Sequence, residues 1–254
     1  MRALRAFLFN VLFFAGTTAL CICMVPLMPF GRKANQLVGH MWCHLTQGAL
    51  AISVGMYKRI RGLENLPKGP CILVAKHQSA WETLTFHTVV PDPAYILKKE
   101  LTRIPLMGQF LLFSGQIAVD RSAGSSALKD MIKGAERALE DGRQIVIFPE
   151  GTRTPSRRKL GQLQRGVANI AIETQVDLIP VVVHCNHDTL KKGVPWYRIP
   201  PSKIRFRLVV DAPLSFGDIA DPTLSRAKQA RLLTRIIKDY YLDRLTHDFA
   251  GNRT

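Results

Sequence analysis

Acidic residues are missing from the first quarter of this 254-residue chain. Residues 1–63 hold no Asp or Glu, but they hold seven basic residues: Arg2, Arg5, Arg32, Lys33, Lys58, Arg59 and Arg61. Over the whole chain, 35 Lys and Arg outnumber 19 Asp and Glu and give a formal net charge of +16. This excess predicts an anionic partner, and composition alone leaves nucleic acid, anionic lipid and a phosphorylated substrate open.

Cysteine is scarce, and its spacing carries no recognisable pattern. The chain has no C-x-x-C pair and no zinc-ligand spacing among its five cysteines: Cys21, Cys23, Cys43, Cys71 and Cys185. Their odd number, and the apolar segments around three of them, favour reduced and buried thiols. We therefore expect neither a metal site nor a disulfide framework.

Two classes of function lack their sequence signatures. No G-x-S-x-G nucleophile elbow occurs, which argues against a serine hydrolase that acts on lipids. Aromatic residues make up only 8% and are scattered, whereas a membrane-tethered nucleic-acid binder would interleave them with basic residues on one face. Both classes are therefore kept only as alternatives, and no nucleic acid is expected among the partners.

Charge is also absent from two long stretches near the N-terminus. No charged residue lies between Arg5 and Arg32, or between Lys33 and Lys58. About 20 apolar residues cross the roughly 30 Å of bilayer hydrocarbon, so each stretch is long enough to span a membrane. A second apolar segment follows the first at once, which is not typical of a cleaved signal peptide.

The basic clusters leave two membrane arrangements open. Two crossings would place Arg32 and Lys33 on the side opposite the other clusters, against the tendency of basic loops to stay cytoplasmic. A helical hairpin in one leaflet would instead keep every cluster at the anionic surface. We expect residues 1–57 to form a membrane-anchoring helical hairpin and residues 58–254 to form one α/β domain.

Short apolar runs alternate with longer helical ones from residue 64 onward. The expected strands are Cys71–Ala75, Tyr95–Leu97, Gln116–Val119, Gln144–Phe148, Leu178–His184 and Ile204–Val210. The expected helices are Ala80–Val89, Leu101–Phe113, Ser125–Asp141, Gln162–Gln175 and Thr223–Thr246. This alternation predicts an α/β fold with a mixed, largely parallel sheet covered by helices, preceded by the N-terminal apolar two-helix membrane motif. In such sheets ligands gather beyond the carboxyl ends of the strands.

A histidine and a carboxylate follow the first of these strands. His77 stands where the strand ends, and Glu82 falls in the first turn of the next helix. A carboxylate that holds an imidazole fixes its tautomer and stabilises the imidazolium, which makes the pair a good general base. Ser79-Ala80-Trp81-Glu82 also fits a capping box, in which Glu82 would only start the helix. Both interpretations stay open from the residues alone.

A basic turn follows the strand that ends at Phe148. Pro149-Glu150-Gly151 predicts a turn with exposed backbone amides, and Arg153 can fork onto a phosphate. A plain β-turn with a solvated arginine explains the same residues. No acidic residue stands between Glu150 and Glu173, which suits an anion pocket and suits a membrane-facing basic surface equally.

Four blocks together resemble the glycerolipid acyltransferase family, in particular bacterial 1-acyl-glycerol-3-phosphate (lysophosphatidic acid) acyltransferases. The first block is His77-Gln78-Ser79-Ala80-Trp81-Glu82, with Glu in place of the family's Asp. The second runs from Lys98-Lys99-Glu100-Leu101 through Ile104-Pro105, Gly108 and Gly115 to Val119-Asp120-Arg121. The third is Phe148-Pro149-Glu150-Gly151-Thr152-Arg153, and the fourth is Ile179-Pro180-Val181. The resemblance covers roughly residues 60–215.

The resemblance implies roles for the residues in these blocks. His77 would act as base on an acceptor hydroxyl that attacks an acyl thioester directly, and Glu82 would orient His77. Because Glu82 is one methylene longer than Asp, we expect that either its geometry with His77 shifts slightly or the turn adjusts. The residues that would bind the substrate phosphate are Arg121, Arg153, Lys98, Lys99, Glu150, Gly151 and Thr152.

The implied reaction moves a fatty acyl chain to the 2-hydroxyl of lysophosphatidic acid and yields phosphatidic acid. The donor would be acyl-CoA or an acyl carrier protein thioester, which is a co-substrate, and no cofactor is expected. Another lysophospholipid or a lyso-ornithine lipid is the alternative acceptor. The expected partners also include an anionic phospholipid membrane. The expected location is the bacterial inner membrane, with the active site on its cytoplasmic face.

Overall fold

The structure is a computed structural model that describes residues 2–154, 159–185 and 203–250. Its strands are β1 (Tyr57–Arg61), β2 (Cys71–Ala75), β3 (Pro93–Lys98), β4 (Ile117–Val119), β5 (Gln144–Ile147), β6 (Leu178–Cys185) and β7 (Arg205–Val210). Its α-helices are α1 (Arg2–Met24), α2 (Gly31–Val54), α3 (Trp81–Val89), α4 (Met107–Phe113), α5 (Ser125–Glu140), α6 (Gly166–Thr174), α7 (Phe216–Ile219) and α8 (Arg226–Ala250). Short 3₁₀ helices are η1 (Val25–Phe30), η2 (Leu63–Asn65), η3 (Lys99–Arg103) and η4 (Arg121–Ala123).

The seven described strands form one sheet in the order β1-β7-β6-β2-β5-β3-β4. Strands β2 to β6 run parallel to one another, β7 is antiparallel to β6, and β1 is parallel to β7. The carboxyl ends of five strands therefore share one edge of the sheet. The expected α/β fold with a mixed, largely parallel sheet is confirmed.

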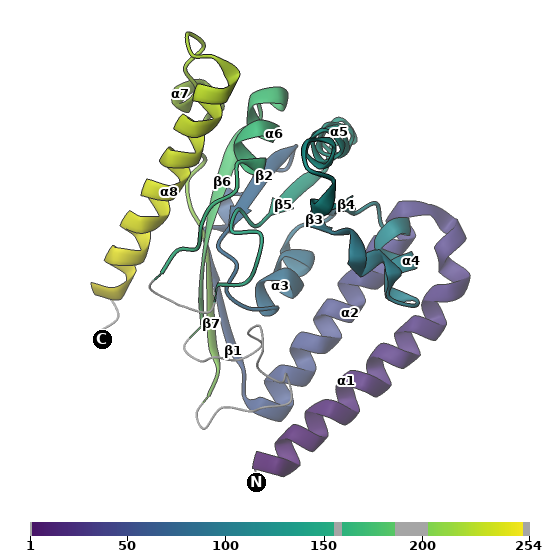
Figure 1. Ribbon diagram of the computed structural model, residues 1–254. Helices are drawn as coiled ribbons and strands as arrows, with labels where there is room; N and C mark the ends of the chain where they lie inside the picture. The colour runs from purple at the N-terminus through teal and green to yellow at the C-terminus, as the bar shows by residue number, and fades with distance from the viewer. Residues whose placement is uncertain (1, 155–158, 186–202, 251–254) are drawn as a thin grey trace.

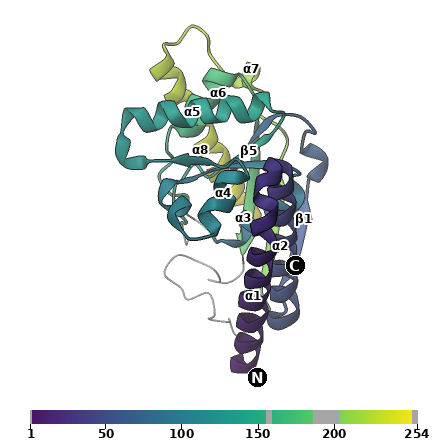
Figure 2. The ribbon, with the colours of Figure 1, turned by 90° about the vertical axis from the view of Figure 1, so that its right-hand side faces the viewer.

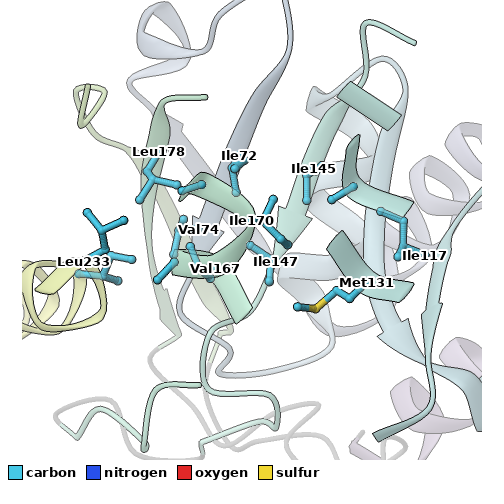
Figure 3. Packing of buried hydrophobic residues seen from close by; sticks show 14 of the residues in the cluster. Ile72, Val74, Ile117, Met131, Ile145, Ile147, Val167, Ile170, Leu178 and Leu233 are labelled. Carbon is cyan, nitrogen blue, oxygen red and sulfur yellow. The ribbon is translucent and has the colours of Figure 1, made fainter. Parts of the chain in front are cut away.

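Hydrophobic residues pack on both faces of this sheet. Side chains alternate along a strand, so Ile72 and Val74 of β2 face one side while Leu73 and Ala75 face the other. The first side packs against α5, α6 and α8, as Figure 3 shows for the side chains around Ile170. The second side packs against α2 and α3. Burial on both faces explains why the central strands are almost continuously apolar.

The two N-terminal helices form an antiparallel hairpin beside the sheet. Pro26 and Pro29 fall in η1, where the chain reverses between α1 and α2. Leu20 and Val38 pack against each other, and Trp42 Nε1 donates a hydrogen bond to Thr17 Oγ1 at 3.0 Å. Figure 1 shows this hairpin on one side of the molecule and α8 on the other, and Figure 2 shows the two helices running side by side. The expected two-helix motif is present.

The hairpin is tied to the sheet along its second helix. Leu50 and Val54 of α2 belong to the core under the sheet. At the other end of α2, Gln36 Nε2 donates to the carbonyl oxygens of Pro93 at 3.0 Å and Ser114 at 3.1 Å. These contacts make α2 part of the folded α/β unit. The domain boundary at residue 57 stays a prediction.

Arg32, at the turn of the hairpin, forms an ion pair with Asp92 in the loop before β3. Asp92 also accepts from Arg143 Nε at 3.0 Å. Burial, followed by the nearby charge of Arg32, lowers the pKa of Arg143 to about 10. The turn of the hairpin is thereby anchored to the α/β domain, at the edge of the sheet where β3 and β5 begin.

One expected helix is wrong, and two elements, strand β1 and the short helix α7, were not expected. The single helix expected over Leu101–Phe113 is instead η3 followed by α4, because Pro105 disfavours helical backbone at Ile104 and Leu106 adopts a positive φ of 61°. Strand β1 was not expected, since its residues are mostly exposed and polar. The other expected elements are present, although several begin or end a few residues away from the expected positions.

The run Leu4–Val54 contains a stretch long and apolar enough to cross a membrane, and core helices and signal sequences pass the same test. Cys43, Cys71 and Cys185 are buried, and Cys21 is half-buried. Burial, with the nearby charge of Asp177, raises the pKa of Cys71 to about 12, which keeps this thiol protonated. The expected burial therefore holds for three of the cysteines, whereas Cys23 is exposed, and the reduced state of the thiols stays a prediction.

Candidate active site

The residues of the first three blocks meet at the carboxyl edge of the sheet. His77 follows β2, the Pro149–Arg153 turn follows β5, Lys98 ends β3 and Arg121 follows β4. Because β2, β5, β3 and β4 are consecutive neighbours in the sheet, these positions form one row. The row is where parallel α/β sheets bind their ligands.

His77 and Glu82 are in direct contact. His77 Nδ1 lies 3.0 Å from Glu82 Oε1, and the Glu82 side chain is fully buried while that of His77 is 17% exposed. A carboxylate acceptor at Nδ1 holds the proton there and leaves Nε2 as the basic nitrogen of the ring. The geometry therefore suits a general base.

Glu82 also starts helix α3. Its Oε1 accepts from the backbone amides of Gln78 at 2.6 Å and Ser79 at 2.7 Å, and its Oε2 accepts from Ser79 Oγ at 2.8 Å. Ser79 Oγ in turn accepts from the Trp81 amide at 3.0 Å. The carboxylate that orders the turn before the helix is therefore also the partner of the imidazole. The capping box is present only in part, because the N-cap residue of α3 is Ala80 and not Ser79.

The His77 ring and its main chain are held by the segment that follows β5. The ring stacks on Phe148, with centroids 4.0 Å apart and an interplanar angle of 19°. The His77 amide donates to Glu150 Oε1 at 3.2 Å, and its carbonyl accepts from the Thr154 amide at 2.8 Å. The third block therefore positions the histidine of the first.

Glu150 points into the protein. Its side chain is fully buried, and Oε1 lies 3.4 Å from Nζ of the equally buried Lys76. Its other oxygen, Oε2, accepts from the Gly161 amide at 3.0 Å. The resemblance implies that Glu150 belongs to the phosphate pocket, but the structure places its carboxylate beneath the turn.

Arg121 reaches across the end of β3 to the turn after β5. Its Nη1 donates to the Gly151 carbonyl oxygen at 2.5 Å. Gly151 has a φ of +64°, and a Cβ there would lie 3.2 Å from the same nitrogen, so glycine suits both the backbone and the close approach. The exposed guanidinium of Arg121 thus lies against the turn that carries Arg153.

The other predicted phosphate ligands lie around this contact. Arg153 is half-buried, whereas Thr152, Lys98 and Lys99 are exposed. Lys99 Nζ lies 3.5 Å from Asp120 Oδ2. Hydrogen bonds from Ser122, helped by Lys99, lower the pKa of Asp120, so this carboxylate remains charged and holds Lys99 near the end of β4.

Sequence reasoning did not single out Lys76 or the ring of Phe148. In the sequence, Lys76 is an ordinary basic residue at a strand end, and only the structure shows that its side chain is completely buried. A signal was available for Phe148, since it is the first residue of the third block. Among the side chains that the structure describes, no group of three His, Cys, Asp or Glu gathers closely enough to hold a metal ion.

Comparisons with known proteins define the class. A family model described as acyltransferase matches residues 58–184, which include all the residues of the row. The chain belongs to the acyltransferase family. A 1-acyl-sn-glycerol-3-phosphate acyltransferase of Pseudomonas aeruginosa is 32% identical over 203 residues, which cover 79% of this chain and 77% of that protein.

A further sequence relative and a solved structure also match this chain. A Saccharomyces cerevisiae protein of the same name is 31% identical over 136 residues, which cover 53% of this chain and 45% of that protein. The crystal structure of the 1-acyl-sn-glycerophosphate (LPA) acyltransferase PlsC from Thermotoga maritima superposes with a TM-score of 0.75 over all of both chains, at 20% identity. That likeness confirms the fold.

Proposed function

We propose that this enzyme transfers a fatty acyl group from a thioester to the 2-hydroxyl of 1-acyl-sn-glycerol-3-phosphate. The observation that carries the proposal is the His77–Glu82 pair, which stands in the same row of strand ends as the contact between Arg121 and Gly151. A general base beside guanidinium groups suits an acceptor that has both a hydroxyl and a phosphate. The relatives named for this reaction support the choice of acceptor.

In the proposed mechanism, His77 Nε2 takes the proton of the acceptor hydroxyl while the oxygen attacks the thioester carbonyl carbon. The imidazolium that forms is stabilised by Glu82 through Nδ1. The tetrahedral intermediate then collapses, the C–S bond breaks, and the proton on Nε2 passes to the departing thiolate. The donor is acyl-CoA or acyl carrier protein thioester, and the reaction as proposed needs no cofactor. Positioning of the two substrates supplies the rest of the rate.

An acceptor and donor panel tests the proposed function with purified enzyme. Lysophosphatidic acid, a second lysophospholipid, a lyso-ornithine lipid and glycerol-3-phosphate are each offered with acyl-CoA and with acyl carrier protein thioester. We expect lysophosphatidic acid to give the highest kcat/KM. A higher value for either of the other two lysolipids would replace the acceptor, and hydrolysis of the lipid without acyl transfer would overturn the reaction class.

Arg121→Ala is expected to raise the KM for lysophosphatidic acid about tenfold or more and to change kcat little. The reason is that a charge-assisted hydrogen bond to a phosphate is lost while His77 and Glu82 remain in contact. Steady-state kinetics with varied acceptor measure the two constants. Arg137→Ala is a suitable control, because Arg137 lies in the last turn of α5, away from the row of strand ends. An unchanged KM for Arg121→Ala would remove this residue from the phosphate pocket.

We further propose that the hairpin attaches the enzyme to one leaflet of an anionic membrane, with the active site on the cytoplasmic face of the bacterial inner membrane. Exposed large apolar side chains along α1 support attachment: Leu4, Phe7, Leu8, Val11, Leu12 and Phe14. The ion pair between Arg32 and Asp92 supports the one-leaflet arrangement, because a turn docked on the α/β domain does not lie across a bilayer. Intracellular acyl thioesters and a bacterial relative support the location.

Leu4→Gln/Leu12→Gln is expected to weaken binding to anionic phospholipid vesicles about tenfold, because two side chains that would enter the hydrocarbon become polar. Vesicle flotation at limiting lipid concentration measures the change. Leu63→Gln/Leu242→Gln is the matched control, since it replaces two exposed leucines of η2 and α8. Equal binding of the two double variants would contradict the anchoring role of α1.

A further inference from the structure

A buried ion pair stands directly behind the proposed base. Lys76 Nζ lies 3.4 Å from Glu150 Oε1, and both side chains are fully buried. A buried pair of charges is a poor source of stability, because an apolar pair of similar shape often serves the fold equally well. The position of this pair, one residue before His77, points to another role.

Both carboxylate oxygens of Glu150 accept hydrogen bonds from backbone amides near the site. Oε1 accepts from the His77 amide at 3.2 Å as well as from Lys76, and Oε2 accepts from the Gly161 amide at 3.0 Å. A Cβ on Gly161 would lie 2.8 Å from Oε2, so the approach of this segment depends on glycine. The carboxylate thus joins the end of β2, the turn after β5 and the segment before α6.

The negative charge of the Glu150 carboxylate makes it an unfavourable ligand for a phosphate. A carboxylate repels a phosphate, and this one is fully buried and occupied by three donors. Lys76 supplies the opposite charge, so the pair adds no net negative charge beside the arginines. The carboxylate also fixes the amide of the residue that must aim its ring at the acceptor hydroxyl.

We propose that Glu150 is a positioning residue for His77, and that Lys76 is the counter-charge that holds the Glu150 carboxylate in place. This inference rests on the proposed role of His77 as the base. It gives the third block a function in orienting the first, in addition to the contact of Gly151 with Arg121. It also removes Glu150 from the set of phosphate ligands.

Two double variants isolate the acceptor at the His77 amide. K76M/E150Q and K76M/E150M both replace the ion pair by a neutral pair of similar volume, and only the glutamine keeps an oxygen that accepts from the His77 amide. We expect K76M/E150Q to retain kcat within about fivefold of the parent, and K76M/E150M to fall about tenfold or more below K76M/E150Q. The KM for the acceptor is expected to be the same in both.

Hydrogen exchange supplies a measurement that needs no substrate. The amide of His77 is expected to exchange about tenfold faster in K76M/E150M than in K76M/E150Q, because it loses its acceptor. Equal kcat values together with equal exchange rates would overturn the proposal. A rise in acceptor KM at constant kcat in K76M/E150Q would also overturn it, since that result assigns Glu150 to the phosphate.

Two outcomes need separate interpretation. If circular dichroism shows that K76M/E150M is unfolded, K76M/E150Q is compared with the parent instead. A loss of kcat well beyond fivefold in K76M/E150Q then overturns the proposal. If the parent transfers no acyl group to any acceptor of the panel, the proposed function fails. The exchange rates of the His77 amide then still show whether Glu150 holds this residue.

Discussion

Replacing His77 by alanine is expected to lower kcat for acyl transfer by about three orders of magnitude. An alcohol is a poor nucleophile at neutral pH, and general-base assistance contributes about 10²–10⁴ in rate. In the structure this imidazole is held at Nδ1 by Glu82 and against the ring of Phe148. Single-turnover measurements with saturating donor and acceptor would report the loss at the chemical step.

His44→Ala is the control for the loss of an imidazole. His44 is exposed on α2, and its removal should leave kcat unchanged. The thermal transition of His77→Ala should stay close to that of the parent, because only the stacking on Phe148 and one hydrogen bond are lost. Retention of more than a tenth of the parental kcat in a folded His77→Ala variant would remove the base assignment.

Glu82→Gln is expected to lower kcat about 100-fold and to destabilise the fold at the same time. The carboxylate accepts from His77, from the amides of Gln78 and Ser79, and from Ser79 Oγ. The amide of Gln presents an NH₂ group to some of these donors, which weakens the start of the helix. The imidazolium also loses its counter-charge, which weakens His77 as a base. Steady-state kinetics and thermal unfolding on the same preparations measure the two effects.

Ser79→Ala separates the two roles of Glu82. This change removes the hydroxyl contacts to Glu82 and to the Trp81 amide, but it leaves the contact between His77 and Glu82. It should cost about 1 kcal/mol of stability, as the loss of a helix cap does, with kcat per folded molecule within about threefold of the parent. If Ser79→Ala lowers kcat as far as Glu82→Gln does, Glu82 acts only through the start of the helix.

The length of Glu82 is accommodated by the turn between β2 and α3. The sequence leaves open a slight shift in the geometry with His77 or an adjustment of the turn, because this side chain is one methylene longer than the family's Asp. In the structure the carboxylate still meets His77 Nδ1 at 3.0 Å, and the same oxygen accepts two amides of the turn. The added length therefore lets one carboxylate order both the turn and the ring.

Most of the elements could be predicted from local pattern alone. The central strands are apolar on both faces and are bounded by turn residues, so Cys71–Ala75 is recovered to the residue. β1 escaped prediction because an exposed edge strand with the sequence Tyr-Lys-Arg-Ile-Arg has no hydrophobic periodicity. The break at Ile104 and Pro105 was readable from the proline, but the apolar run around it favoured one helix.

The candidate site was predictable to the level of residues, and its contacts were not. His77, Glu82, Arg121 and Arg153 were identified because each follows a strand or stands in a family block. Lys76 was not identified, because no property of a single lysine at a strand end indicates that it will be fully buried. The burial of Glu150 was likewise invisible from the sequence, and the positioning role proposed for this carboxylate replaces the phosphate-binding role that the resemblance implies.

The sequence by itself determined the order of strands and helices along the chain, the apolar hairpin and the residue types available for chemistry. These properties depend on a few neighbouring residues, through periodicity, turn preference and charge. Only the tertiary structure decided which groups meet, because the sheet places β2 beside β5 and β5 beside β3, out of chain order. Hence His77 receives its main-chain support from Glu150, 73 positions away, and Arg121 meets Gly151 across β3.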